Sequence, residues 1–365
     1  MIKVKPFIFG VAGTELTPKE IKIFEQHPCE GFILFTRNIA SKNQLKALTN
    51  SLKWLYPYRE VPILIDQEGG RVARLKPPIA QDKYPEASYF SDVYKQDKQI
   101  ALTAVKANYV KLMKELKKFH IDSPCAPVCD LSHPATHEII GTRSFGSSTD
   151  QVISLAKAAI QGITEQKGIP IIKHIPGHGR STQDSHLDLP VIDTNLGTLE
   201  QTDFKVFQAL SDEDDVWGMS AHIIYKALDP NNPATLSSKV IKYIRDKIGF
   251  KGKLLTDDIN MLALHGELGK KLSTLKKIIK AIEDNQQINL YWMRDYQDYF
   301  NETLNGLSSR EITKECWKQV RILQPEYNTS LKEAAKSSLE AGCDIVLHCS
   351  GNIEEISALC ELDLT

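Results

Sequence analysis

The sequence predicts an α/β protein built as a (β/α)8 barrel of the TIM type, in a single domain of 365 residues. The first observation is that short apolar segments alternate with segments of helical periodicity along the whole chain. The second is that polar residues follow the carboxyl ends of these apolar segments, and a barrel gathers all such ends on the face that holds active sites. A doubly wound sheet is the competing fold, but the chain has no GxGxxG or GxxxxGK[ST] nucleotide-binding loop.

Eight apolar segments are the expected strands, since each is short and bounded by turn or polar residues. They are 7–12, 31–35, 61–65, 123–129, 169–172, 216–220, 253–255 and 344–348. Between them, apolar residues recur at three- and four-residue spacing, which predicts helices. These helices are 19–26, 42–54, 100–119, 150–166, 199–210, 238–247 and 330–341.

One connection is too long for this pattern. More than 80 residues separate Asp257 from the eighth strand, far above a βα loop with one helix. Because 330–341 has the pattern of the barrel helix, residues 266–329 are expected to form a helical insertion between strand 7 and that helix. Helical spacing recurs there over three segments, 272–282, 291–304 and 311–320. Aromatic residues of the middle segment would line a sugar site or, by the favoured interpretation, pack the core of the insertion.

The final helix is expected to be short, because only residues 353–362 are left for it after the eighth strand. The barrel is therefore expected to close with a short helix or with help from a partner chain, and the sequence does not give the oligomeric state.

Composition excludes several classes of partner. A net charge of −1 provides no basic face for nucleic acid or for a membrane surface, and no apolar segment approaches the roughly 18 residues of a transmembrane helix. The N-terminal residues 1–13 lack a signal-peptide cleavage pattern and are interpreted as a first strand. The seven cysteines are odd in number and contain no CxxC pair, which favours free thiols in a reducing cytoplasm.

Residues 173–190, KHIPGHGRSTQDSHLDLP, are the densest group of ionisable side chains. The candidates there are Lys173, His174, His178, Asp184 and His186. In an extended loop Asp184 and His186, two residues apart, would point the same way, so that the carboxylate could orient the imidazole as a proton shuttle near neutral pH. Alone, a D-x-H pair is also compatible with an ordinary surface loop.

The seventh strand ends in two adjacent acids, Asp257 and Asp258, within LLTDDINM. Strand alternation sends them to opposite sides, so one could face the barrel mouth as a nucleophile while the other holds a loop or caps the next helix.

The third strand is followed by DQEGGRVAR, with Asp66, Arg71 and Arg74 around a Gly-Gly turn, and such groups bind polar ligands.

Together, the segments KHIPGHGRSTQDSH, DQEGGRVAR, GTRSFG, AHIIY and TDDINM resemble glycoside hydrolase family 3. The resemblance is to its compact bacterial members, the β-N-acetylglucosaminidases (β-hexosaminidases) of peptidoglycan recycling. GVAGTELTPKE, GFILFTRN and AGCDIVLHC are similar to the same subgroup, and the resemblance spans about 260 residues. Glucosidase-type members usually carry a second domain with an acid/base glutamate, and no such domain is expected within these 365 residues.

The resemblance implies a role for individual residues. Asp257 matches the nucleophile, His186 the acid/base, and Asp184 the aspartate of its dyad. The implied sugar-binding residues are Asp66, Arg74, Arg143, Lys173 and His174. Three more residues lie in matching motifs whose roles stay open: His178, His222 and Met261.

The implied function is retaining hydrolysis of terminal non-reducing β-N-acetylglucosamine, from an amino-sugar disaccharide or muropeptide such as GlcNAc-1,6-anhydro-MurNAc, without cofactor or metal. Three alternatives remain. Another β-glycoside could be the substrate, or phosphate the acceptor. A metal-dependent hydrolase could use the histidines, although HxH and HExxH pairs are absent from the sequence. A non-catalytic sugar-binding protein would need the insertion to block the mouth.

Overall fold

A parallel sheet lies at the centre of the computed structural model, which describes residues 4–134, 136–182, 189–213, 215–284, 304 and 306–364. Its strands are β1 (Lys5–Gly10), β2 (Cys29–Leu34), β3 (Ile63–Ile65), β6 (Ile171–Ile175), β8 (Trp217–Ser220), β10 (Leu254–Asp258) and β11 (Ile345–His348). The order across this sheet is β3-β2-β1-β11-β10-β8-β6, and each pairing is parallel.

Residues 123–129 join the two edges of this sheet. Leu64 of β3 pairs with Ser123, and Val128 pairs with Lys173 of β6, both as isolated parallel bridges. The Ile171 amide also donates to the Ala126 carbonyl at 2.8 Å. Pro124 and Pro127 have no N–H to donate, which explains why this segment bonds irregularly. It takes the place of the predicted fourth strand, and the prediction of an eight-stranded barrel is confirmed.

The barrel interior is filled by apolar side chains from all eight segments, as expected for a barrel of this size. They include Ile8, Ile33, Leu64, Cys125, Ile171, Met219, Leu255 and Ile345, each buried. A larger apolar core lies between the strands and the surrounding helices. The strands are therefore covered on both faces, which is why they appear in the sequence as short apolar segments.

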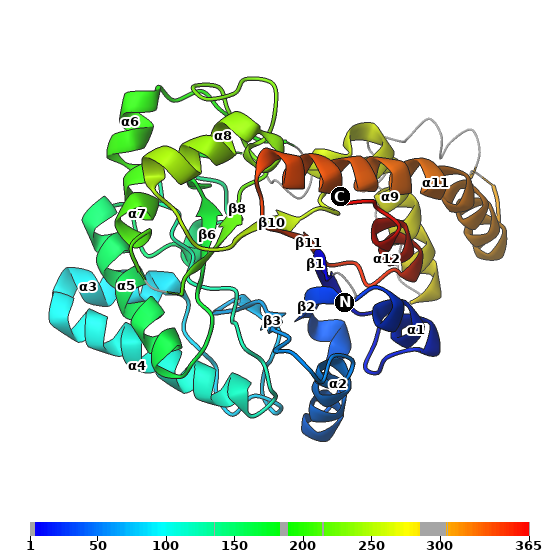
Figure 1. Ribbon diagram of the computed structural model, residues 1–365, viewed down its shortest axis with the longest axis horizontal. Helices are drawn as coiled ribbons and strands as arrows, with labels where there is room; N and C mark the ends of the chain where they lie inside the picture. The colour runs from blue at the N-terminus through cyan, green and yellow to red at the C-terminus, as the bar shows by residue number, and fades with distance from the viewer. Residues whose placement is uncertain are drawn as a thin grey trace.

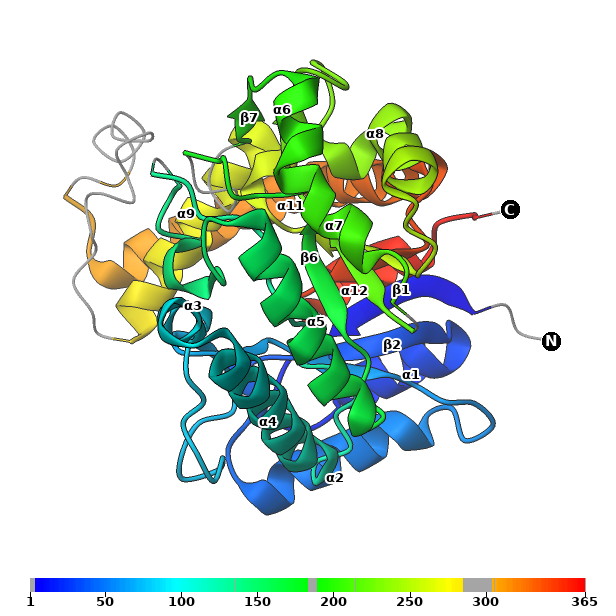
Figure 2. The same cartoon turned by 90° about the vertical axis from the view of Figure 1, so that its left-hand side faces the viewer.

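Helices surround the strands, as Figure 1 shows. They are α1 (Pro18–Gln26), α2 (Lys42–Trp54), α3 (Ala87–Gln96), α4 (Lys98–Lys117), α5 (Thr149–Glu165), α6 (Leu196–Gln201), α7 (Asp203–Leu210), α8 (Ser238–Tyr243), α9 (Gly266–Glu283), α11 (Ser309–Ala341) and α12 (Ile353–Cys360). In Figure 2, α5 and α7 lie in front of β6. Thr17 and Ser41 begin α1 and α2 with capping boxes, which fixes those helix starts.

Short strands accompany the loops at the barrel mouth. An antiparallel hairpin, β4 (Gln67–Gly69) with β5 (Val72–Ala73), follows β3 directly. A parallel pair, β7 (Val191–Ile192) with β9 (Ile224–Tyr225), joins the connections that follow β6 and β8.

The expected insertion contains α9 and the first part of α11, which pack side by side and extend to the right-hand edge of Figure 1. Their contact has its own apolar core, which includes Leu272, Ile279, Ile312 and Val320. The 33-residue helix α11 continues without interruption into residues 330–341, so the insertion and the barrel helix share one helix. The predicted helix at 291–304, with its aromatic residues, lies outside the described residues except for Leu304.

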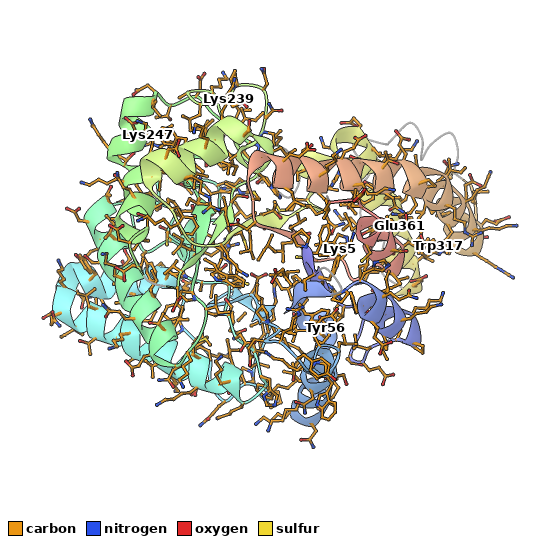
Figure 3. The ribbon with its side chains drawn as sticks, viewed as in Figure 1. Lys5, Tyr56, Lys239, Lys247, Trp317 and Glu361 are labelled. Atoms are coloured by element: carbon orange, nitrogen blue, oxygen red, sulfur yellow. The ribbon has the colours of Figure 1, made fainter. Side chains whose placement is uncertain are left out.

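The C-terminal helix α12 is short, one of the two outcomes that the sequence left open. It packs against α1 and α11, and Lys5 Nζ donates to the Leu362 carbonyl at 2.6 Å. Figure 3 shows Lys5 near Glu361, so the first strand of the barrel and the segment after its last helix lie side by side.

All seven cysteines are free and buried. Among the described helices, none has the length and apolar character needed to cross a membrane.

Glu355 of α12 connects the insertion to the barrel. Its side chain is 2% exposed and accepts hydrogen bonds from many donors. These are Asn260, Lys276, Gln324, His348, Ser350 and Asn352. Burial opposes ionisation of this carboxyl, but the hydrogen bond from His348 and the neighbouring charges outweigh burial and lower its pKa to about 2.

We expect Glu355→Gln to lower the free energy of unfolding by about 2 kcal/mol at pH 7, because the Lys276 ammonium and the other donors lose their buried carboxylate. A depressed pKa contributes stability above the unfolded value of 4.5, and that stability is lost as pH falls toward 2. Urea unfolding of both proteins should therefore give a difference that shrinks over that interval. Glu340→Gln, at an exposed site on α11, is the control. A difference equal at pH 7 and pH 3 would contradict this role.

Candidate functional site

A cavity of about 390 Å³ lies at the carboxyl ends of the barrel strands, and we call it the mouth cavity. Eight of the predicted site residues line it: Asp66, Arg74, Arg143, Lys173, His174, His178, Asp257 and Met261. They come from segments far apart in the sequence, and the barrel brings them together. Asp184 and His186 lie outside the described residues, and His222 is buried behind the cavity wall.

Asp66 follows β3 and faces two cations. Its Oδ2 accepts from Arg74 Nη2 at 3.0 Å, and its Oδ1 lies 3.3 Å from Lys173 Nζ. The β4–β5 hairpin turns the chain back so that Arg74 reaches the carboxylate eight residues earlier. Asp66 remains one-fifth exposed, so its carboxylate is accessible to a ligand in the cavity.

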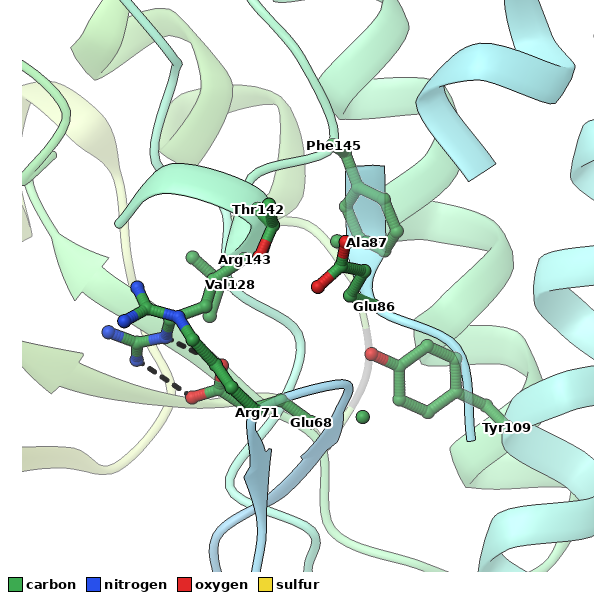
Figure 4. A pocket seen from close by; sticks show the side chains of 10 residues that line it. Glu68, Arg71, Glu86, Ala87, Tyr109, Val128, Thr142, Arg143 and Phe145 are labelled. Atoms are coloured by element: carbon green, nitrogen blue, oxygen red, sulfur yellow. Dashed lines mark hydrogen bonds and ion pairs between the residues drawn. The ribbon is translucent and has the colours of Figure 1, made fainter. Parts of the chain in front are cut away.

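Glu68 is a site residue that the sequence analysis did not select. Arg143 donates to both carboxylate oxygens, at 2.7 and 2.8 Å, as Figure 4 shows, and Lys173 Nζ lies 2.6 Å from Oε1. Burial favours the neutral acid, but Arg143 and Lys173 outweigh burial and hold the pKa of Glu68 well below its usual range. The signal was present in the sequence, since Asp66 and Glu68 are two residues apart and can share one side of an extended chain.

Asp130, which ends the fourth strand segment, is the second residue missed. It is fully buried and accepts from His174 Nδ1 at 2.7 Å. Its other oxygen accepts from the backbone amides of His174 at 3.1 Å and His178 at 2.6 Å. Because a carboxylate only accepts, the His174 proton is placed on Nδ1, and Nε2 is the ring nitrogen left for a ligand. Asp130 thus orients His174 and shapes the start of the loop after β6.

His178 lies beside His174, with ring centroids 5.4 Å apart. Burial, and then the neighbouring His174, lowers the pKa of His178 to about 4, so its imidazole is neutral at pH 7.

The loop after β6 is fixed at its start by α7. Asp203 accepts from Arg180 Nε at 2.6 Å and from His133 Nε2 at 3.1 Å. Gly179 has no side chain because a Cβ there would lie 1.8 Å from the Leu131 carbonyl oxygen. The segment that leads toward Asp184 and His186 is therefore held on the barrel by buried contacts.

Asp257 and Asp258 end β10, and both contribute to the cavity wall. The Asp258 amide donates to Asp257 Oδ1 at 2.8 Å. Asp258 Oδ1 in turn accepts from the amides of Asn260 and Cys349, at 3.1 and 3.0 Å, so this second acid holds the ends of β10 and β11 together. Partial burial raises the pKa of Asp258 to about 6.

His222 acts on β10 from outside the cavity. Its Nε2 donates to the Asp258 carbonyl at 3.1 Å, which leaves Nδ1 to accept from the Thr235 hydroxyl at 2.8 Å. Burial lowers the pKa of His222, in keeping with this neutral tautomer. We assign His222 to the support of the strand that carries Asp257.

The described residues contain no group of three or more His, Cys, Asp or Glu side chains placed to hold a metal ion. Of the histidines considered as ligands, His174 is engaged with Asp130, and His222 with Thr235 and Asp258. The mouth cavity instead combines a carboxylate, Asp257, with a network of charged hydrogen-bonding groups, an arrangement suited to a ligand rich in hydroxyl groups.

Known proteins are similar to this chain in sequence and in fold. Residues 9–308 match the glycosyl hydrolase family 3 N-terminal domain. The β-hexosaminidase of Methylobacillus flagellatus is 34% identical over 260 residues, covering 70% of this chain and 72% of that protein. The β-hexosaminidase of Haemophilus ducreyi is 30% identical over 302 residues, covering 82% and 84%. The crystal structure of NagZ from Neisseria gonorrhoeae in complex with N-trifluoroacetyl-D-glucosamine matches with a TM-score of 0.75 at 29% identity, over 99% of this chain and 85% of that chain. The expected relationship is confirmed: this chain belongs to glycosyl hydrolase family 3.

Proposed function

We propose that this chain is a β-N-acetylhexosaminidase that removes terminal non-reducing β-N-acetylglucosamine with retention of configuration. The observation that carries the proposal is the meeting of Asp257 with the network around Asp66, Glu68 and Lys173 in one cavity. Similar proteins support the choice of sugar, because the curated relatives are named β-hexosaminidases and a matching structure holds an N-acylated glucosamine.

The charged network supplies the sugar-binding groups. Asp66 accepts hydrogen bonds from sugar hydroxyls, while Arg74, Arg143 and Lys173 donate to hydroxyl and carbonyl oxygens. The Glu68 carboxylate binds the Arg143 and Lys173 side chains, so both cations are held in place before substrate arrives. His174, fixed through Nδ1, presents Nε2 as an acceptor. Such preorganisation reduces the entropy lost on binding.

The reaction is a double displacement. In the first step a carboxylate oxygen of Asp257 attacks the anomeric carbon as the glycosidic bond breaks, and His186 donates its proton to the leaving oxygen. In the second step His186 takes a proton from water, which attacks the same carbon and releases Asp257. Asp184 orients His186 throughout. An imidazole with an ordinary pKa near 6.5 suits both roles near neutral pH.

Support behind β10 keeps the proposed nucleophile in position. The Asp258 amide donates to one oxygen of Asp257, and His222 holds the Asp258 carbonyl from the other side of the strand. These contacts restrict how the Asp257 carboxylate can rotate, which favours a near-attack geometry.

The natural substrate we propose is GlcNAc-1,6-anhydro-MurNAc, with or without a stem peptide, in the recycling of cell wall within the cytoplasm. The direct test is hydrolysis of that disaccharide by the purified protein, with product analysis by mass spectrometry. Nitrophenyl glycosides of N-acetylglucosamine, glucose and xylose, assayed with and without phosphate, separate this function from a related glycosidase or a phosphorylase. Faster turnover of the glucoside, or turnover that requires phosphate, would contradict it.

Replacing Asp257 with Ala should reduce kcat on nitrophenyl N-acetyl-β-glucosaminide on the order of 10⁴-fold, because the covalent intermediate cannot form. Added azide should restore part of the activity and give the inverted glycosyl azide, which identifies the missing group as the nucleophile. Asp246→Ala, at an exposed acid beyond α8, should leave kcat unchanged. Substantial turnover by the Asp257 variant alone would assign the nucleophile elsewhere.

His186→Ala should lower kcat/KM by about 10²- to 10⁴-fold on a phenyl glycoside, whose poor leaving group needs a proton. The loss should be smaller on a dinitrophenyl glycoside, whose leaving group departs as an anion, and binding of N-acetylglucosamine should persist. His120→Asn, at an exposed site after α4, serves as the control. Equal losses on both substrates would exclude His186 as the acid.

Asp66→Ala should weaken substrate binding and lower kcat/KM by about 100-fold, because charged hydrogen bonds to sugar hydroxyls are lost. Steady-state kinetics and calorimetric titration with N-acetylglucosamine measure the effect. Asp92→Ala, on the exposed side of α3, is the matched control. An unchanged affinity would remove Asp66 from the sugar site.

A further inference from the structure

A second cavity, of about 300 Å³, lies beside α9 at the same end of the barrel. We call it the lysine cavity because three lysines lie in its wall. The wall residues used below are Leu262, Leu272, Ser273, Lys276, Lys277 and Lys280. The proposed glycosidase reaction uses none of them.

The turn that follows β10 separates the two cavities. Asp258 and Met261 line the mouth cavity, whereas Asn260 and Leu262 line the lysine cavity. A ligand in the lysine cavity would therefore lie against the opposite side of the turn that follows the proposed nucleophile, without entering the sugar site.

Positive charge is concentrated in the lysine cavity because Lys276, Lys277 and Lys280 come from one face of α9. Lys276 Nζ lies 3.3 Å from Glu355, the one carboxylate in the described wall. That carboxylate is already occupied by the donors described above. Within the described residues, Lys277 and Lys280 form no ion pair. Among its described wall residues, the lysine cavity therefore has more cationic than anionic side chains.

Apolar and hydroxyl-bearing side chains complete the wall. Leu262 supplies partly exposed apolar surface, Leu272 is buried beneath it in the core of the insertion, and Ser273 adds a hydroxyl one helical turn before Lys277. Tyr327 closes one side, with Lys276 Nζ 5.9 Å from its ring centroid. A fully hydrated inorganic ion would leave this apolar surface unused, whereas an apolar body with an anionic end would cover it.

We propose that the lysine cavity binds a small amphipathic anion, with an apolar body against Leu262 and a phosphate or carboxylate group at Lys277 and Lys280. This site is independent of the glycosidase function proposed above. The ligand that we expect has one apolar group about the size of a benzene ring and a single anionic group.

Calorimetric titration of the full chain with phenyl phosphate tests the proposal. We expect saturable binding that is tighter than binding of inorganic phosphate or phenol, since each of these lacks one half of the recognised chemistry. The double variant Lys277→Glu/Lys280→Glu should weaken phenyl phosphate binding by about tenfold or more, because two attractive charges become repulsive. Benzoate in place of phenyl phosphate compares a carboxylate head with a phosphate head.

The matched control is Lys239→Glu/Lys247→Glu, the same change of charge at two exposed lysines near α8, labelled in Figure 3. It should leave the affinity within about twofold, and thermal unfolding of both variants verifies that they fold. No saturable binding, or equal weakening by both variants, would overturn the site. An affinity for inorganic phosphate equal to that for phenyl phosphate would overturn the apolar contact. Because the readout is binding, these results do not depend on hydrolytic activity.

Discussion

A parallel sheet satisfies its edge hydrogen bonds only when it is paired or closed, and here the proline-containing segment 123–129 joins β3 to β6. Because all the strands run in the same direction, closure of the barrel brings their carboxyl ends together at one mouth. The interior then admits apolar side chains from all eight segments, so polar side chains are displaced to the rim. Both the composition of the strands and the place of the site follow from this closure.

The mouth cavity depends in turn on a balance of buried charges. Glu68, Arg143 and Lys173 would each be costly to bury alone, but the carboxylate receives a bidentate bond from Arg143 and a short contact from Lys173. Asp130 is likewise a buried carboxylate with several donors: it accepts from two backbone amides and one imidazole, and so fixes the start of the loop after β6. These acids do not need to touch a substrate to matter, because they fix the groups that would.

The insertion shows how a barrel helix can be extended. The apolar pattern at 330–341 has the spacing of an ordinary barrel helix, but α11 begins at Ser309 and passes through Pro325. Packing against α9 stabilises this extension, and Glu355 links both helices to the ends of β10 and β11. Periodicity alone marked helical segments on both sides of residue 329 and gave no reason to join them.

The amino-acid sequence by itself determined the strands, the polar residues that end them and most of the mouth cavity, because apolar segments and strand-end side chains are local features of the chain. Asp66, Lys173 and Asp257 could be selected in this way, whereas Arg74 and Arg143 were selected through the resemblance to a family. Only the tertiary structure assigned Glu68 and Asp130 to the support of the site and placed His222 behind β10, because their partners lie far away in the chain. Electrostatic compensation between distant residues has no local signature, so it emerges only when the barrel brings their strands together.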